Sequence, residues 1–435
     1  MNTITDTEVA ALNRTVAPPI KDAVEFDIVL KPYQQFFLGN GAPVYYINDG
    51  AEEVTMIELV FNAGNVFENK NLVAGAANYL IKNGTGKKTA LEINEHFEYY
   101  GAYLNRSCQN ETSTVTLHCL SKHLKEILPL TREIITDSVF PEQELEIFKQ
   151  NSIQRLAVNM QKCDFVANRL IDQYLYGIDH PYGRVSSVAD IQAITREDLV
   201  NFFKQYYLNA KCTVFAAGKL PTDFEDLLQT HFGDLKLNEN IPVVIHKAGM
   251  ATEKKSRVMN DANGVQGAIR IARPFPNRHH PDFKKVAVLN VLFGGFFGSR
   301  LMSNIREEKG YTYGIHSFLE NHIRESAWVV STEAGKDVCE AAVEEVYKEM
   351  KLLRDEVIDE EELLLVKNYM MGISLGDVDG PFHVISRWKS LILNDLDVNY
   401  FNDYINTIKT ISATELKALA NKYLLPEEFF ELIVI

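Results

Sequence analysis

The residues of this chain best suited to chemistry are Arg306 and Tyr313, seven positions apart. Ser299 can cap a helix and Gly310 can adopt the left-handed conformation that ends it, so Arg306 is expected in the last helical turn. Polar and apolar residues alternate from 311 to 318, which predicts a strand with Tyr313 near its start. A guanidinium and a phenol that point into one space can both hydrogen-bond a peptide carbonyl.

A purely structural explanation of these two residues stays open. Arginine is favoured near a helix C-terminus by the macrodipole, and tyrosine readily forms strands. The spacing alone does not separate a substrate-binding pair from two residues placed for local stability.

The histidines and cysteines show no metal-binding pattern. None of the 11 histidines has another four residues away, the spacing that puts two ligands on one helical face. His118 and His123 are five apart, and His279 and His280 are adjacent. The 5 cysteines are scattered without a C-x-x-C pair, which favours free thiols in a reducing compartment. We expect no metal in this chain.

Composition and charge exclude several classes of function. The chain has 435 residues, too many for one typical domain, with 46% hydrophobic and 24% charged content. Its net charge of −15 argues against nucleic acid and anionic membranes as partners. The N-terminus lacks the features of a secretory signal, so we expect a cytoplasmic protein. The longest apolar-rich window, 286–297, is too short and too broken by glycine to cross a membrane.

An internal duplication divides the chain. The segment 138–151 is similar to 356–369, at an offset of 218 residues, and 194–199 is similar to 411–416, at an offset of 217. The second pair carries the capping-box patterns Thr195/Asp198 and Ser412/Glu415, which predict a helix start in each copy. Two nearly equal offsets favour duplication over chance similarity.

Each half mixes alternating segments with long amphipathic ones. Strands are expected at 43–47, 54–62, 113–119, 212–217 and 429–435, and helices at 120–137 and 142–161. This order predicts an α+β fold of two homologous domains, each a mostly antiparallel sheet packed with helices. We expect an N-terminal extension at 1–30, a first domain at 31–225, a linker at 226–255 and a second domain at 256–435.

Several strings together resemble one family. The run from Gly298 to Gly314 is similar to the C-terminal-half signature of the pitrilysin/insulinase metallopeptidases, in the shorter two-domain form that includes subunits of mitochondrial processing peptidase. The first half carries further similar strings: Asn40-Gly-Ala-Pro-Val, Phe61-Asn-Ala-Gly-Asn-Val-Phe-Glu, Asn83-Gly-Thr and His180-Pro-Tyr-Gly-Arg. Each string is weak, but their order and spacing are specific, and the resemblance covers about residues 30–435. It implies one α+β unit in each half.

The resemblance also shows what this chain has lost. Active members bind zinc through H-x-x-E-H on a helix, with the glutamate activating a metal-bound water. Alignment on Gly84-Thr85 puts those five positions at 75–79, which read Gly-Ala-Ala-Asn-Tyr, so Gly75, Asn78 and Tyr79 replace the two ligands and the base. The third ligand falls near Gln154 or Arg155, and neither replaces it.

The other half of the family's site is retained. The resemblance carries the substrate-binding arginine and tyrosine onto Arg306 and Tyr313, where the phenol can donate to the oxygen that becomes an oxyanion. It also places a glycine-rich substrate loop at Gly294, Gly295 and Gly298, although these glycines equally suit close helix packing.

These observations predict a catalytically incomplete, non-zinc subunit of a heterodimeric zinc metallopeptidase. The partner would be a homologue with H-x-x-E-H that brings the zinc, and the substrate would be a peptide. Two alternatives stay open: a catalytically inert structural homologue, and a homodimeric peptide-binding module that needs no zinc partner.

Overall fold

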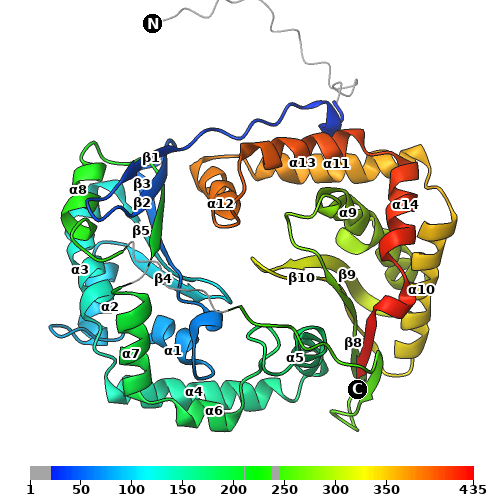
Figure 1. Ribbon diagram of the computed structural model, residues 1–435, viewed down its shortest axis with the longest axis horizontal. Helices are drawn as coiled ribbons and strands as arrows, with labels where there is room; N and C mark the ends of the chain where they lie inside the picture. The colour runs from blue at the N-terminus through cyan, green and yellow to red at the C-terminus, as the bar shows by residue number, and fades with distance from the viewer. Residues whose placement is uncertain (1–20, 210, 238–244) are drawn as a thin grey trace, which may run out of the picture.

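The computed structural model describes residues 21–209, 211–237 and 245–435. Within these ranges the chain forms two sheets on opposite sides of the molecule, each accompanied by its own set of helices (Figure 1). The expected α+β fold with two similar halves is confirmed.

The two sheets share one topology. The first has the order β1 (Gln34–Phe37), β2 (Pro43–Asn48), β6 (Cys212–Gly218), β3 (Val54–Phe61), β5 (Ser113–Leu120) and β4 (Tyr103–Cys108). The second has the order β7 (Lys255–Val258), β11 (Phe430–Val434), β8 (Gln266–Phe275), β10 (Ser326–Gly335) and β9 (Thr312–Asn321). In each sheet one neighbouring pair is parallel, β2 with β6 and β7 with β11, and the other pairs are antiparallel. Apart from β1 the strand orders match, so the duplication extends to topology.

The helices follow the same division. Those of the first half are α1 (Val73–Leu80), α2 (Ala90–Tyr99), α3 (Leu124–Asp137), α4 (Glu142–Asn159), α5 (Cys163–Tyr176), α6 (Val188–Ala193), α7 (Arg196–Tyr206) and α8 (Phe224–Phe232). Those of the second half are α9 (Phe283–Asn290), α10 (Cys339–Asp355), α11 (Glu360–Gly376), α12 (Pro381–Ile392), α13 (Val398–Thr410) and α14 (Ala413–Tyr423). The segment expected as a linker, 226–255, begins inside α8, and its residues 238–244 lie outside the described ranges. No helix of the described ranges is both long enough and apolar enough to cross a membrane.

The predicted capping boxes form at both equivalent helices. The Thr195 hydroxyl accepts from the backbone N–H of Asp198 (3.2 Å), and the Asp198 carboxylate accepts from the N–H of Thr195 (2.8 Å). Ser412 and Glu415 repeat this exchange at 3.2 and 3.1 Å. Each box pairs otherwise unbonded groups at a helix start, which fixes where α7 and α14 begin.

Two equivalent helices are exchanged between the halves. The 218-residue offset carries Cys163, the first residue of α5, onto Pro381, the first residue of α12. Helix α5 packs on β8 and β11 of the second sheet, whereas α12 packs on β2 and β6 of the first. Each hydrophobic core therefore contains side chains from both halves.

A buried charge reinforces each exchanged helix. Arg270 of β8 is fully buried and pairs with Asp164 of α5. In the other half, Glu58 of β3 accepts from Lys389 of α12 at 2.7 and 3.0 Å. Because loss of one partner leaves the other charge buried and unpaired, these contacts resist separation of the halves.

Candidate functional site

Arg306 and Tyr313 lie side by side at the edge of the second sheet. Arg306 is in the last turn of a π-helical segment, Met302–Glu308, and Tyr313 is the second residue of β9. The guanidinium carbon of Arg306 lies 5.5 Å from the centre of the Tyr313 ring. The predicted placement of both residues on a helix end and a strand start is confirmed.

A third side chain, Phe297, completes this cluster. Its ring centre lies 4.5 Å from the guanidinium carbon of Arg306, so the guanidinium is near two aromatic rings. Such cation–π contacts stabilise the position of the guanidinium beside the two rings. Phe297 is 60% exposed and Tyr313 is 92% exposed, so the site is open to solvent.

The hydrogen-bonding capacity of the cluster is largely unused. The Nη1 atom of Arg306 is buried and has no hydrogen-bond partner among the described residues. A buried donor without an acceptor is unfavourable, and it donates a hydrogen bond readily to any acceptor that reaches it. The guanidinium and the exposed phenol of Tyr313 together offer donors for a carbonyl or an oxyanion.

The turn that positions this pair differs in one respect from the sequence prediction. Gly310 has a φ of +65°, in the left-handed region, as expected for the residue that ends the helical segment. Ser299 stands directly before the first helical residue, as the sequence predicts, but its side chain does not cap the helix. Its hydroxyl is buried without a hydrogen-bond partner in the described structure, while its backbone carbonyl accepts the first bond of the helix, from the N–H of Ser303 (2.9 Å). Ser299 is only 1% exposed, so its side chain lies in the interior.

A pocket of about 600 Å³ lies over the start of β9 and the adjoining end of β10. Tyr311, Tyr313 and His316 line it from β9 and the turn before it, Glu333 from β10 and Asp164 from α5. In the described part of the sheet β9 pairs only with β10, so β9 is an edge strand. Such an edge has backbone groups that an extended peptide can pair with.

The positions that align with the zinc motif lie on α1. The Asn78 side chain is buried and donates to the Thr114 carbonyl (3.2 Å) and the Tyr207 hydroxyl (3.1 Å). The Tyr79 ring centre lies 5.3 Å from that of Phe148. Asn78 therefore serves the packing of the first half rather than ligand binding.

No metal site replaces the lost motif in the described part of the chain. A β-carbon at Gly75 would meet nothing within 4 Å, so this position is open but has no side chain. Gln154 and Arg155 are exposed on α4. Among residues 21–209, 211–237 and 245–435, no group of three or more histidine, cysteine or carboxylate side chains is arranged to hold a metal ion. The residues present do not fit the family's zinc.

The three glycines of the expected substrate loop have different surroundings. A β-carbon at Gly294 would lie 2.7 Å from the Cβ of Ser317 and 2.8 Å from Cδ1 of Leu301, so this glycine permits close packing. Gly295 is half-buried, and a β-carbon there would lie 3.1 Å from Cγ2 of Val291. Gly298 is exposed beside Phe297. The geometry favours a packing role for Gly294, and of the three glycines only Gly298 is exposed.

Sequence reasoning missed a half-buried acidic pair between the halves. Burial raises the pKa of Asp172, on α5, to about 7, with a further contribution from Glu320 of β9 and an opposing one from Arg270. Burial also raises the pKa of Glu320. The pair depends on α5 crossing to the second sheet, so no local pattern indicates it.

Two family models match this chain. The model for insulinase, peptidase family M16, matches residues 43–178, and the model for the peptidase M16 inactive domain matches 193–370. Together with the duplicated α+β fold, these matches define the class. The chain belongs to the insulinase family of peptidases, family M16.

Individual relatives agree with this assignment. A protein of Rickettsia felis described as an uncharacterized zinc protease is 22% identical over 341 residues, which span 77% of this chain and 81% of the relative. The mitochondrial-processing peptidase subunit beta of Rattus norvegicus is 24% identical over 79% of this chain and 72% of its own length. The crystal structure of a peptidase M16 inactive domain from Pseudomonas fluorescens superposes with a TM-score of 0.81 at 21% identity, covering 92% of this chain and 98% of that one.

Proposed function

We propose that this chain is the non-zinc subunit of a heterodimeric zinc metalloendopeptidase. One observation carries the proposal: Arg306 and Tyr313 are stacked beside a pocket at the edge of the second sheet, while residues 75–79 of the first half lack every group of the zinc motif. A chain with half of a peptidase site is expected to complete that site with a second chain. The rat relative is itself named as a subunit, which supports a paired arrangement.

In the assembled enzyme, this chain would bind and orient the peptide. Arg306 would hold a carbonyl oxygen through a guanidinium N–H donor, and Tyr313 would donate to the same oxygen as negative charge develops on it. The partner would supply the metal that activates water, together with an edge strand for the extended substrate. We therefore propose that this chain binds peptide, forms a heterodimer and is located in the cytoplasm.

Metal analysis and activity assays on separate and mixed chains test the proposal. After dialysis, this chain alone should retain no stoichiometric zinc and should cleave no peptide. A homologue with H-x-x-E-H should carry the zinc, and light scattering of the mixture should reveal a complex of roughly twice the mass of this chain. A tightly held zinc in this chain, lost on mutation of nearby histidines, would contradict the proposal. An unchanged activity on mixing would favour an inert structural or peptide-binding homologue.

A further inference from the structure

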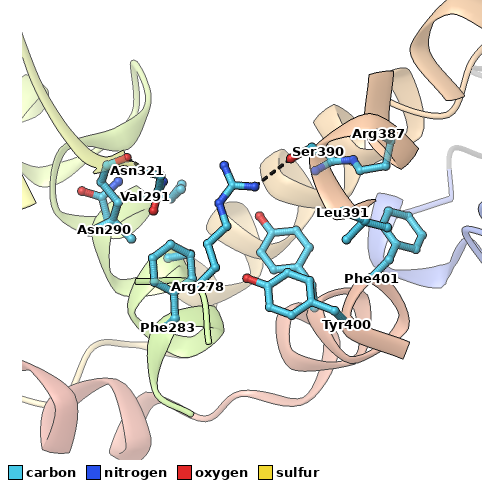
Figure 2. Close-up of a pocket in the computed structure, with 13 residues that line it drawn as sticks. Arg278, Phe283, Asn290, Val291, Asn321, Arg387, Ser390, Leu391, Tyr400 and Phe401 are labelled. Carbon is cyan, nitrogen blue, oxygen red and sulfur yellow. Dashed lines mark hydrogen bonds between the residues drawn. The ribbon is translucent and has the colours of Figure 1, made fainter. Parts of the chain in front are cut away.

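A second, separate pocket of about 260 Å³ lies among α9, α12, α13 and the end of β9. Figure 2 shows Arg278 in the middle of this pocket, with its guanidinium between side chains from the other elements. Tyr313 is near the start of β9 and Asn321, which lines this pocket, is its last residue. At about 3.4 Å per residue the two sites are roughly 25–30 Å apart.

Arg278 is a half-buried cation that pairs with no carboxylate of the described residues. Its Nη1 atom donates to the Ser390 hydroxyl at 2.7 Å, which is a neutral acceptor (Figure 2). No ion pair between described residues includes Arg278, and burial lowers the pKa of its guanidinium. Removing a guanidinium from water without a compensating anion is unfavourable.

A second arginine lines the same pocket. Arg387 of α12 pairs with Asp377, and its guanidinium carbon lies 5.8 Å from the ring centre of Phe401. Burial lowers the pKa of Arg387, and the positive charge of Arg278 lowers it further. Two cations that repel one another therefore line the pocket, no carboxylate is among its described lining residues, and Asp377, outside that lining, neutralises only Arg387.

Two tyrosines of α13 add neutral donors. Burial raises the pKa of Tyr400 to about 12 and also raises that of Tyr404, so both phenols keep their protons at neutral pH. Neither hydroxyl hydrogen-bonds to another described residue, although both residues line the pocket. Phe283 and Leu391 form part of an apolar wall beside these donors.

Arg278 can also be explained as a tether between the loop after β8 and α12. A tether to Ser390 uses only one of the five guanidinium donors. It does not explain why a second arginine and two tyrosines line the same cavity. Guanidinium groups favour carboxylate and phosphate because these accept paired hydrogen bonds. The apolar wall suits a small hydrophobic body.

We propose that this pocket binds a small organic oxyanion, a carboxylate or phosphate group carried on an aromatic or branched apolar body. Arg278 contacts the anion, the hydroxyls of Tyr400 and Tyr404 donate to it, and the apolar wall holds the attached group. The ligand would connect the loop after β8 with α12 and α13. This site is independent of the peptidase proposal, because it shares no residue with the Arg306 cluster.

Calorimetric titration of the full chain tests this inference. The probes are inorganic phosphate, phenyl phosphate, N-acetylphenylalanine and the amide of N-acetylphenylalanine, at constant ionic strength. We expect saturable binding of an aromatic anion and weaker binding of inorganic phosphate. Binding of the free acid but not its amide assigns a carboxylate ligand, and preference for phenyl phosphate assigns a phosphate ester. Absence of saturable binding for every probe below roughly 10 mM would overturn the proposal.

Variants separate the proposed binding role from a structural one. Arg278→Gln should weaken binding of the aromatic anion by about tenfold or more, since a charge-assisted contact is lost. Tyr404→Phe should weaken it by a smaller factor while keeping the shape of the wall. Arg132→Gln is the matched control, because Arg132 pairs with Asp234 in the first half and should leave affinity unchanged. If Arg278→Gln does not fold, the Tyr404→Phe result decides. Affinity unchanged in whichever of these two variants folds would contradict the proposal.

Discussion

The guanidinium of Arg306 stacks on the ring of Tyr313 with 5.5 Å between the guanidinium carbon and the ring centre, while 92% of Tyr313 stays exposed. One residue ends a helical segment and the other begins an edge strand, and the left-handed Gly310 turns the chain between them. The stack holds the phenol near the cation yet leaves its hydroxyl available. This geometry suits a substrate-binding role and leads to the first two predictions.

Tyr313→Phe should lower turnover of the assembled peptidase by about 100-fold or more, because loss of one oxyanion donor typically has that effect. The fold should not change, since the hydroxyl makes no hydrogen bond to another described residue and the ring is exposed. Steady-state kinetics and a thermal unfolding curve of the same preparation provide the test. Full activity in this variant would remove the phenol from the mechanism.

Arg306→Lys should be nearly as damaging as Arg306→Ala. Lysine keeps the positive charge but loses the planar fork and the stacking between Phe297 and Tyr313. Peptide affinity and turnover should be measured for both variants in the presence of the partner. If lysine restores wild-type kinetics, charge alone matters and the stacked geometry has no functional role.

Gly294→Ala should destabilise the chain by about 1–3 kcal/mol, because the added methyl group would meet Ser317 and Leu301 at less than 3 Å. Gly372→Ala is the control, since a β-carbon there meets nothing within 4 Å. Denaturant unfolding of both variants gives the comparison. Equal stability of the two would argue against the packing role of Gly294.

Asp172→Asn should stabilise the chain at alkaline pH. The folded-state pKa of Asp172 is raised to about 7, so the folded chain favours the protonated acid. Between about pH 4 and 7 the folded state holds a proton that the unfolded state has released, and stability falls as pH rises through this window. The asparagine side chain cannot ionise, so the variant avoids this fall in folding stability.

At pH 8 the stability gained through Asp172→Asn should be on the order of 1 kcal/mol or more, and this gain should shrink toward zero near pH 4. Unfolding measured at several pH values tests this, with Asp179→Asn, at an exposed carboxylate, as the control. A stability difference between wild type and Asp172→Asn that does not vary with pH would contradict the assignment.

The sequence predicts the local elements around the site well, because local signals determine them. Glycine adopts the left-handed conformation that ends a helical turn without help from distant residues, as Gly310 does here. The capping boxes of Thr195 and Ser412 likewise involve residues only three apart. Ser299 lies at the predicted helix start, but its hydroxyl is buried in the interior and makes no capping hydrogen bond. The local preference of serine for helix starts does not determine where its side chain points.

Contacts between distant segments could not be predicted. The proximity of Asp172 to Glu320 depends on α5 lying against the sheet of the opposite half, and the pocket around Arg278 depends on α9, β9, α12 and α13 of the second half meeting around one cavity. The duplication indicates that α5 and α12 are equivalent but does not indicate which sheet each one contacts. The functional roles of Arg306 and Tyr313 remain predictions from the family resemblance.

The most direct test of the central claim is a titration of an H-x-x-E-H homologue with this chain, monitored by peptide cleavage. Wild-type chain should raise activity until the two subunits are equimolar. The Arg306→Ala, Tyr313→Phe double variant should bind the homologue equally well, as shown by light scattering, yet support at most about one hundredth of that activity. A homologue that is fully active alone and unaffected by either chain would contradict the account.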